Sequence, residues 1–211
     1  MSDGTAHRTR REELFEVALL FAAAVAVLLL SAVVARRPVS SVETDVFRTV
    51  NDLPAWLETP IWPLMQYGTF LTIPILALVA FAFRRIRLGL AMLMAGVGVY
   101  LVAKLVKGLV DRGRPGAVLD GISHREVFEE GSLGFPSGHA AVATALTFVV
   151  WRHLGPRWGV AALVLAIVVM IGRMYVGAHL PLDLVGGAAL GAVTASIANV
   201  AVPPRSPRVT R

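Results

Sequence analysis

The 211-residue sequence contains no cysteine, only two lysines and few charged residues of any kind. Without cysteine, disulfides, zinc–thiolate sites, iron–sulfur ligation and thiol catalysis are all excluded. Charged residues make up 16% of the chain and hydrophobic residues 56%, whereas an ordinary soluble domain has about 25% charged residues. The hydrophobic residues also form long blocks. This composition predicts an integral membrane protein rather than a soluble domain.

Six hydrophobic blocks come close to the length of about 20 residues that crosses a bilayer as a helix. They are residues 17–35, 61–83, 88–106, 133–151, 158–172 and 184–202. A cleaved signal peptide does not fit the first block, which exceeds the apolar core of about 7–15 residues in such peptides. The pattern predicts an all-α protein: one bundle of six transmembrane helices within residues 14–202, with tails at residues 1–13 and 203–211.

The arginines indicate how this bundle is oriented. If the tails and the loops at residues 84–87 and 152–157 share one side, that side holds 11 of the 20 Lys and Arg residues and four acidic residues. Because Lys and Arg collect in cytoplasmic loops, both termini are predicted to be cytoplasmic. The net charge of +6 is thus explained by membrane orientation and does not indicate a nucleic-acid partner. No particular oligomeric state is indicated.

Residues 36–60 would lie on the outer side, between the first two blocks. Five apolar residues recur there at helical spacing: Val42, Val46, Val50, Leu53 and Leu57. Charged residues occupy other faces: Glu43, Asp45, Arg48 and Asp52. The segment is either a short helix lying in the membrane interface or an ordinary polar loop.

Charged and polar residues gather in three stretches at the ends of the predicted helices. A Lys, Arg or Asp at the centre of a membrane helix costs about 2.5–3.5 kcal/mol, so such a cluster points to function. The stretches are residues 107–115, 136–139 and 173–183, which the predicted topology places at the outer face. Their candidate site residues are Lys107, Arg114, Ser137, Gly138, His139, Arg173, His179 and Asp183.

These residue types suit a phosphate group. Lys107, Arg114 and Arg173 supply three cations with little local acid, and arginine binds phosphate oxygens in pairs. Ser137 and Gly138 precede an apolar block, where Ser137 can cap a helix whose free backbone N–H groups bind an anion. The cluster therefore predicts an anion site with two or more negative charges to satisfy.

His139, His179 and Asp183 add groups that transfer protons and attack phosphorus. Pro181 suits the first position of a helix and discourages helix before it, so His179 and Asp183 are predicted to meet across a turn. Two histidines and one carboxylate do not suit a hydrolytic metal centre, and no cofactor is predicted. The set favours metal-free phosphoryl transfer, with one imidazole attacking phosphorus and the other protonating the leaving oxygen.

The order and spacing of these motifs resemble a known family. The sequence has Lys107-x6-Arg114-Pro115, then Pro136-Ser137-Gly138-His139, then Arg173-x5-His179-x3-Asp183. This is similar to the three-part signature of the type 2 phosphatidic acid phosphatases, which are related to the vanadium haloperoxidases and the bacterial acid phosphatases. The resemblance covers 77 residues, from the lysine to the aspartate.

The resemblance implies a role for each residue. His179 would be the nucleophile that forms a phosphohistidine, Asp183 would orient it, and His139 would act as general acid and then as base. The phosphate would be bound by Lys107, Arg114, Ser137, the backbone N–H of Gly138, and Arg173. Gly172 departs from the family pattern, which has a serine at this place, so one hydroxyl contact is missing.

Other polar residues near the motifs have two interpretations each. Lys104 either extends to the membrane surface or contacts phosphate, and Arg112 contacts either substrate or lipid headgroups. The loop between the first two motifs is either solvated or lines the approach to the site; its residues include His124, Glu126, Glu129 and Glu130. His153, on the predicted cytoplasmic side, is interpreted as structural.

The resemblance implies a lipid phosphate phosphatase with a membrane lipid phosphate as substrate, and the predicted topology places its site at the outer face of the cytoplasmic membrane. The high ratio of arginine to lysine and the abundant Ala, Val and Gly favour a bacterial source. An isoprenoid diphosphate of the undecaprenyl type is the preferred substrate. Phosphatidylglycerophosphate, phosphatidic acid and a lipid-linked sugar phosphate are alternatives. Competing predictions are a vanadate-dependent peroxidase, a membrane scaffold and a lipid transporter or flippase, whose charges would be expected nearer the bilayer midplane.

Overall fold

The computed structural model describes residues 10–127 and 131–204. Within them every regular element is a helix, apart from one isolated β-bridge between Gly113 and Leu133. The predicted all-α class is therefore confirmed. Three parts of the earlier predictions lie outside the described residues: residues 1–9, residues 205–211, and Glu129 with Glu130.

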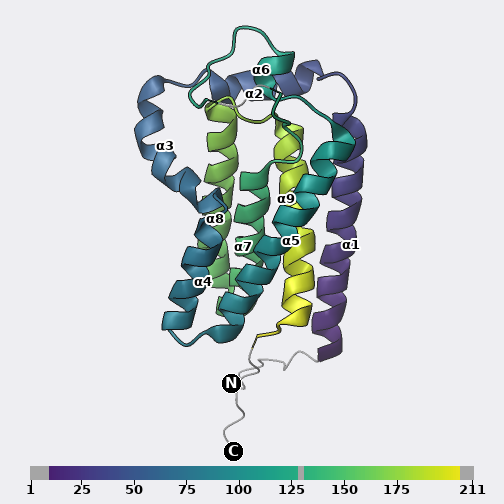
Figure 1. Cartoon of the computed structure of the whole chain (residues 1–211), viewed down its shortest axis with the longest axis vertical. Helices are drawn as coiled ribbons and strands as arrows, with labels where there is room; N and C mark the ends of the chain where they lie inside the picture. Colours follow the sequence, from purple (N-terminus) through teal and green to yellow (C-terminus); the bar gives the residue numbers. More distant parts are fainter. Residues whose placement is uncertain (1–9, 128–130, 205–211) are drawn as a thin grey trace, which may run out of the picture.

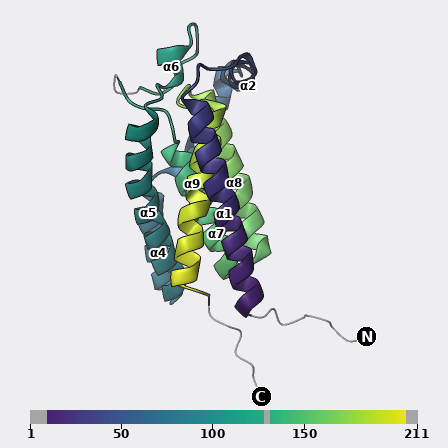
Figure 2. The same ribbon diagram turned by 90° about the vertical axis from the view of Figure 1, so that its right-hand side faces the viewer.

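The long helices run side by side, and two shorter ones lie across one end of the bundle (Figure 1). The α-helices are α1 (Arg10–Ala35), α2 (Ser41–Asn51), α3 (Glu58–Met65), α4 (Thr72–Ala82), α5 (Ile86–Val110), α6 (Pro115–Val118), α7 (Gly138–Leu154), α8 (Pro156–Tyr175) and α9 (Pro181–Ala201). Two 3₁₀ turns flank α3: η1 (Ala55–Leu57) and η2 (Gln66–Gly68). Both views place α2 and α6 at one end, whereas α1 begins and α9 ends at the other (Figures 1 and 2).

Four helices are long and apolar enough to cross a membrane, namely α1, α5, α8 and α9. The bent pair of α3 and α4 adds a fifth crossing if both halves belong to one span. α7 has 17 residues, at the lower end of the range of about 17–25 that spans a bilayer, and it packs against α5, α8 and α9. The chain is a multi-pass membrane protein, and the number of six crossings stays a prediction.

The structure corrects the prediction of one continuous span over residues 61–83. The segment Ala55–Gly68, which contains α3 and η2, is bent by 69° relative to α4, at the break between Gly68 and Thr72. The break frees the carbonyl of Gln66, which accepts a hydrogen bond from the hydroxyl of Thr72 at 2.5 Å; such side chains make a broken membrane helix tolerable. At the bend, a Cβ on Gly68 would lie 2.9 Å from the carbonyl oxygen of His139. The broken span therefore contacts the first turn of α7.

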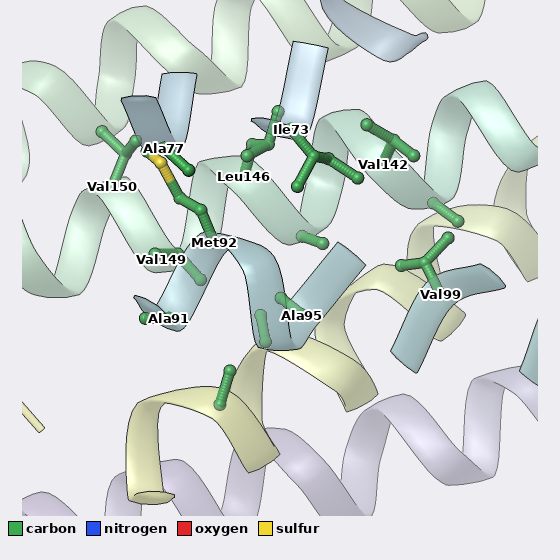
Figure 3. Packing of buried hydrophobic residues seen from close by; sticks show 14 of the residues in the cluster. Ile73, Ala77, Ala91, Met92, Ala95, Val99, Val142, Leu146, Val149 and Val150 are labelled. Carbon is green, nitrogen blue, oxygen red and sulfur yellow. The ribbon is translucent and has the colours of Figure 1, made fainter. Parts of the chain in front are cut away.

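Small residues let the central helices approach closely. Figure 3 shows α4, α5 and α7 meeting in the core through ten labelled side chains: Ile73, Ala77, Ala91, Met92, Ala95, Val99, Val142, Leu146, Val149 and Val150. On the other side of α7, a Cβ added to Gly191 of α9 would collide with the carbonyl oxygen of Ala141. Packing of small residues is a main source of helix association in membranes.

Gly191→Ala is expected to destabilise the protein by about 1–3 kcal/mol, because the methyl group would force α7 and α9 apart. Gly108→Ala is the matched control, since no atom lies within 4 Å of a Cβ added to this helical glycine. It is expected to be neutral or stabilising by up to about 1 kcal/mol. Unfolding in mixed detergent micelles measures both. Equal stability of the two variants would contradict close contact of α7 with α9.

α2 shows that residues 36–60 contain a helix, which is the first of the two interpretations of this segment, and its place in the membrane interface stays a prediction. Val42 and Val46 are 70% and 46% exposed. The buried residues are Glu43, Phe47 and Asn51. The helix presents Glu43 to the bundle because the carboxylate has hydrogen-bonding partners there, and a buried charge needs such partners.

Candidate active site

All eight candidate residues belong to the helix ends that face α2 and α6 (Figure 1). They come from the end of α5 and the start of α6 (Lys107, Arg114), the start of α7 (Ser137, Gly138, His139), and the junction of α8 with α9 (Arg173, His179, Asp183). Three stretches separated in sequence therefore converge at one end of the bundle.

Ser137 caps α7, as predicted. Its hydroxyl accepts a hydrogen bond from the N–H of Ala140 at 3.4 Å, and its own N–H donates to the carbonyl of Asp183 at 2.9 Å. The start of α7 is thus tied to the start of α9. Residues 133–137, predicted to belong to a span, are not helical, because Pro136 disfavours helix at the preceding residue and the helix begins only after its cap.

A tight turn between α8 and α9 carries His179. Gly177 has φ +79°, a conformation that favours glycine. The N–H groups of Ala178 and His179 both donate to the carbonyl of Arg173, at 2.9 and 3.3 Å. The backbone therefore folds back on the end of α8 and places His179 beside Arg173. Leu180 is extended, and α9 begins at the next residue.

His179 and Asp183 meet across this turn, which confirms the prediction of a turn contact. Nδ1 of His179 lies 3.6 Å from Oδ2 of Asp183. The same oxygen accepts the N–H of Leu180 at 2.9 Å. The two side chains are almost fully buried, with His179 2% and Asp183 0% exposed. Because Nδ1 faces the carboxylate, Nε2 is the nitrogen left to face a ligand.

Burial is the main influence on the protonation of His179. It lowers the pKa of the imidazole from 6.5 to about 4; Asp183 opposes this shift, and the positive charges of Arg173 and Arg114 add to it. The histidine is therefore neutral at physiological pH. A neutral imidazole has the free lone pair that a nucleophile needs.

The pH titration of His179 tests this environment directly. In isotope-labelled protein in micelles, the His179 ring signals should keep their neutral shifts down to about pH 5, with a midpoint near 4. The assignment comes from the signal that is missing in His179→Asn. Because the folded-state pKa lies below the unfolded value of 6.5, this group's contribution to stability is complete above pH 6.5 and declines as the pH falls towards 4. A midpoint near 6.5 would contradict burial of this side chain.

Two of the candidate cations hold the loop around the site. Nζ of Lys107 donates to the carbonyl of Leu133 at 2.7 Å. Arg114 donates from Nε to the hydroxyl of Ser132 at 2.8 Å and from Nη1 to the carbonyl of Ala178 at 3.0 Å. Burial lowers the pKa of Arg114, and the positive charge of Arg173 lowers it further. The first motif thus contacts the turn that carries the candidate nucleophile.

The third cation, Arg173, pairs with an acidic residue. Its Nη1 lies 2.5 Å from Oε2 of Glu126. Glu126 also lines a cavity of about 870 Å³, together with Arg114 and His124. Of the two interpretations of this loop, the structure therefore favours lining the approach to the site. The Glu126 carboxylate that pairs with Arg173 therefore forms part of the cavity wall.

His139 lies within electrostatic range of Arg114, Arg173 and His179. The structure therefore brings both histidines, the aspartate and the cations into one cluster. In the described parts of the chain, no group of three or more His, Asp or Glu side chains is arranged to hold a metal ion.

Arg112 and Glu43 complete the cluster, and sequence reasoning missed how they act. Arg112 pairs with both oxygens of Glu43, at 3.1 and 2.6 Å, and with Oδ1 of Asp183 at 3.1 Å. Arg112 is 6% exposed. Neither interpretation of it from the sequence, as a contact to substrate or to lipid headgroups, agrees with this burial. The signal available in the sequence was a lone arginine two residues before Arg114.

Asn51 and Arg125 hold the end of α8 from outside. The Asn51 amide donates to the carbonyls of Ser123, Met174 and Tyr175. Arg125 donates to the Tyr175 carbonyl at 2.6 Å, and its guanidinium lies 4.1 Å from the centre of the Tyr175 ring. These contacts fix the helix end from which the His179 turn departs.

Three other residues discussed from the sequence lie outside the cluster of histidines, aspartate and cations: Lys104, His153 and Gly172. Lys104 is exposed on α5, as expected if it extends to the membrane surface. His153 is in the last turn of α7, at the opposite end of the bundle. Gly172, which replaces the family serine, faces α3, where a Cβ would lie 2.6 Å from Cγ of Met65. A larger residue at this position would therefore collide with α3.

Comparisons with known proteins identify relatives of this chain. The bacitracin transport permease protein BcrC of Bacillus licheniformis is 29% identical over 74% of this chain and 78% of its own length. An undecaprenyl-diphosphatase of Sulfolobus acidocaldarius is 27% identical over 70% of this chain and 72% of its own. Other matching proteins are named lipid A 1-phosphatase, of which the chain spans 38%, and phosphatidylglycerophosphatase B.

The fold also matches a solved structure. The crystal structure of LpxE from Aquifex aeolicus superimposes with a TM-score of 0.69, at 21% identity, over 75% of this chain and 95% of that one. The sequence model of the PAP2 superfamily matches residues 84–207, which is more than half of the chain and includes all three motifs. The chain therefore belongs to the PAP2 superfamily of phosphatases.

Proposed function

We propose that this protein is a membrane lipid phosphate phosphatase that hydrolyses an isoprenoid diphosphate of the undecaprenyl type through a phosphohistidine. The observation that carries the proposal is the convergence of His139, His179, Asp183 and three cations at one end of a membrane bundle. Two relatives, named lipid A 1-phosphatase and phosphatidylglycerophosphatase B, support phosphate removal from a lipid. The undecaprenyl-diphosphatase among the relatives supports this substrate class.

In the first step, Nε2 of His179 attacks phosphorus, and the bond from phosphorus to the leaving oxygen breaks. His139 gives its proton to that oxygen. Asp183 stabilises the positive charge that develops on the phosphorylated imidazole and keeps a proton on Nδ1. In the second step, His139 takes a proton from water, whose oxygen attacks phosphorus and releases phosphate and free His179. Each proton is returned by the end of the cycle.

The cations stabilise the phosphoryl oxygens in both steps. Lys107, Arg114 and Arg173 neutralise charge that spreads over these oxygens, helped by the N–H groups at the start of α7. The Glu126 carboxylate on Arg173 stands where a phosphate oxygen would bind. Substrate phosphate must therefore displace this side chain before it reaches the arginine.

The proposed membrane orientation follows from the distribution of arginine. Both termini lie in the cytoplasm, residues 14–202 form one six-span domain, and the site faces outside at headgroup depth. A diphosphate at the membrane surface would then reach the cations while its isoprenoid tail stays among lipid chains. Phosphatidylglycerophosphate, phosphatidic acid and lipid-linked sugar phosphates have the same division into head and tail and are the alternative substrates.

Phosphate release by the purified protein in detergent, with excess chelator, tests the proposal. The panel contains undecaprenyl diphosphate, phosphatidylglycerophosphate, phosphatidic acid and a lipid-linked sugar phosphate. We expect release to survive chelation and to be fastest with undecaprenyl diphosphate. A faster alternative lipid would replace the substrate assignment, and no release from any lipid would overturn the phosphatase assignment.

A further inference from the structure

A buried chain of charges connects α2 to the candidate nucleophile. Glu43, Arg112 and Asp183 are 7%, 6% and 0% exposed. Asp183 divides its oxygens: Oδ1 faces Arg112 at 3.1 Å, whereas Oδ2 lies 3.6 Å from Nδ1 of His179. The order of contacts is therefore Glu43, Arg112, Asp183, His179.

Glu43 is placed to neutralise Arg112. Both of its oxygens contact the guanidinium, and Oε1 also accepts the N–H of Leu182 in the first turn of α9, at 2.9 Å. A planar arginine matches a carboxylate in this paired way. The single positive charge of Arg112 thus faces two carboxylates, and Glu43 takes the larger share of its hydrogen bonds.

This division matters for the proposed chemistry. A phosphorylated histidine carries a positive charge, which the negative charge of Asp183 must stabilise. If Arg112 paired with Asp183 alone, the arginine would cancel much of that negative charge. With Glu43 present, the three residues carry one net negative charge beside His179.

We propose that Glu43 is a positioning residue, which neutralises Arg112 so that the arginine orients Asp183 without withdrawing its charge from His179. This inference rests on the proposed function, since it assigns a task within the same reaction. It places part of the catalytic control on α2, outside all three motifs.

The test uses charge removal at constant shape. In Glu43→Gln, the amide oxygen can still accept the Leu182 N–H while the negative charge is lost. We expect kcat to fall by roughly 10–100-fold, the loss that is typical when the outer-shell partner of a metal ligand is removed, with a smaller change in KM. Arg112→Met removes the positive charge instead, and Glu43→Gln combined with Arg112→Met restores the net charge.

The titration of His179 distinguishes this role from simple structural support. The charged groups that face His179 are Asp183, Arg114 and Arg173, with His139 nearby. The pKa of His179 should fall in Glu43→Gln, rise in Arg112→Met, and return towards the wild-type value in the double variant. A loss of packing would instead shift the pKa of His179 in the same direction in both single variants and in the double variant. If Arg112→Met does not fold, the Gln variant and the double variant still give the comparison.

A second ion pair provides the matched control. Arg152 and Glu13 join α7 to α1 at the opposite end of the bundle, at 2.7 Å. Glu13→Gln and Arg152→Met should leave both kcat and the His179 titration unchanged. Unchanged kcat in Glu43→Gln, or shifts of the same sign in both single variants, would overturn the inference. If wild-type protein released no phosphate, the proposed function would fail, whereas the titration would still decide the charge coupling.

Discussion

His179→Asn should lower kcat for phosphate release by about 10⁴-fold or more. The variant removes the only atom proposed to bond to phosphorus, and loss of a nucleophile eliminates the covalent route rather than weakening it. Asparagine retains a polar group near Asp183, so the turn that begins at Gly177 can persist. Steady-state phosphate release with the preferred lipid measures the effect.

The corresponding intermediate should be detectable in the wild-type protein. Labelled substrate, quenched in alkali within one turnover, is expected to leave phosphate on the protein as an acid-labile adduct, because a phosphoramidate survives alkali and hydrolyses in acid. The thermal unfolding of His179→Asn in detergent serves as the control for folding. Retention of more than a hundredth of wild-type kcat by a folded variant would exclude this histidine as nucleophile.

His139→Gln should have an effect that depends on the leaving group. For an alkyl phosphate, whose alcohol leaves poorly without a proton, we expect the first step to slow by about 10²–10⁴-fold. For p-nitrophenyl phosphate, whose phenolate leaves without help, the first step should remain fast. The second step, which needs His139 as base, should be slow with both substrates.

Stopped-flow absorbance with p-nitrophenyl phosphate would detect this difference as a burst of about one nitrophenolate per site, followed by slow turnover. The wild-type protein, in which both steps are assisted, is the reference. An equal loss of rate with both substrates and no burst would show that His139 has another role, such as binding phosphate as a fourth cation.

The local structure of the three motifs was predictable from the sequence because it depends on preferences of neighbouring residues. Ser137 caps α7 and Pro181 opens α9, and each of these placements follows from preferences that act within one turn of helix. The contact of His179 with Asp183 across the turn follows from the same rules. The convergence of the three motifs followed from the alternation of membrane spans.

The long-range contacts were not predictable in this way. Glu43 and Arg112 are 69 residues apart, and no local pattern pairs them. In α2 the local pattern did not show that Glu43 faces the bundle, because the partners of its carboxylate, Arg112 and the N–H of Leu182, lie on distant segments. At the bend in residues 61–83, Gly68 likewise lies close to His139 of α7, a contact with a distant segment that no local pattern encodes.

The position of α2 has a consequence for exchanging parts between relatives. The superfamily match begins at residue 84, whereas Glu43 lies on a helix well before it and Asn51 of the same helix holds the end of α8. A chimera that carried only the matched region would leave Arg112 paired with Asp183 alone and would lack the contacts that Asn51 makes with the end of α8. A chimera designed to carry the proposed activity should therefore include α2 together with the three motifs.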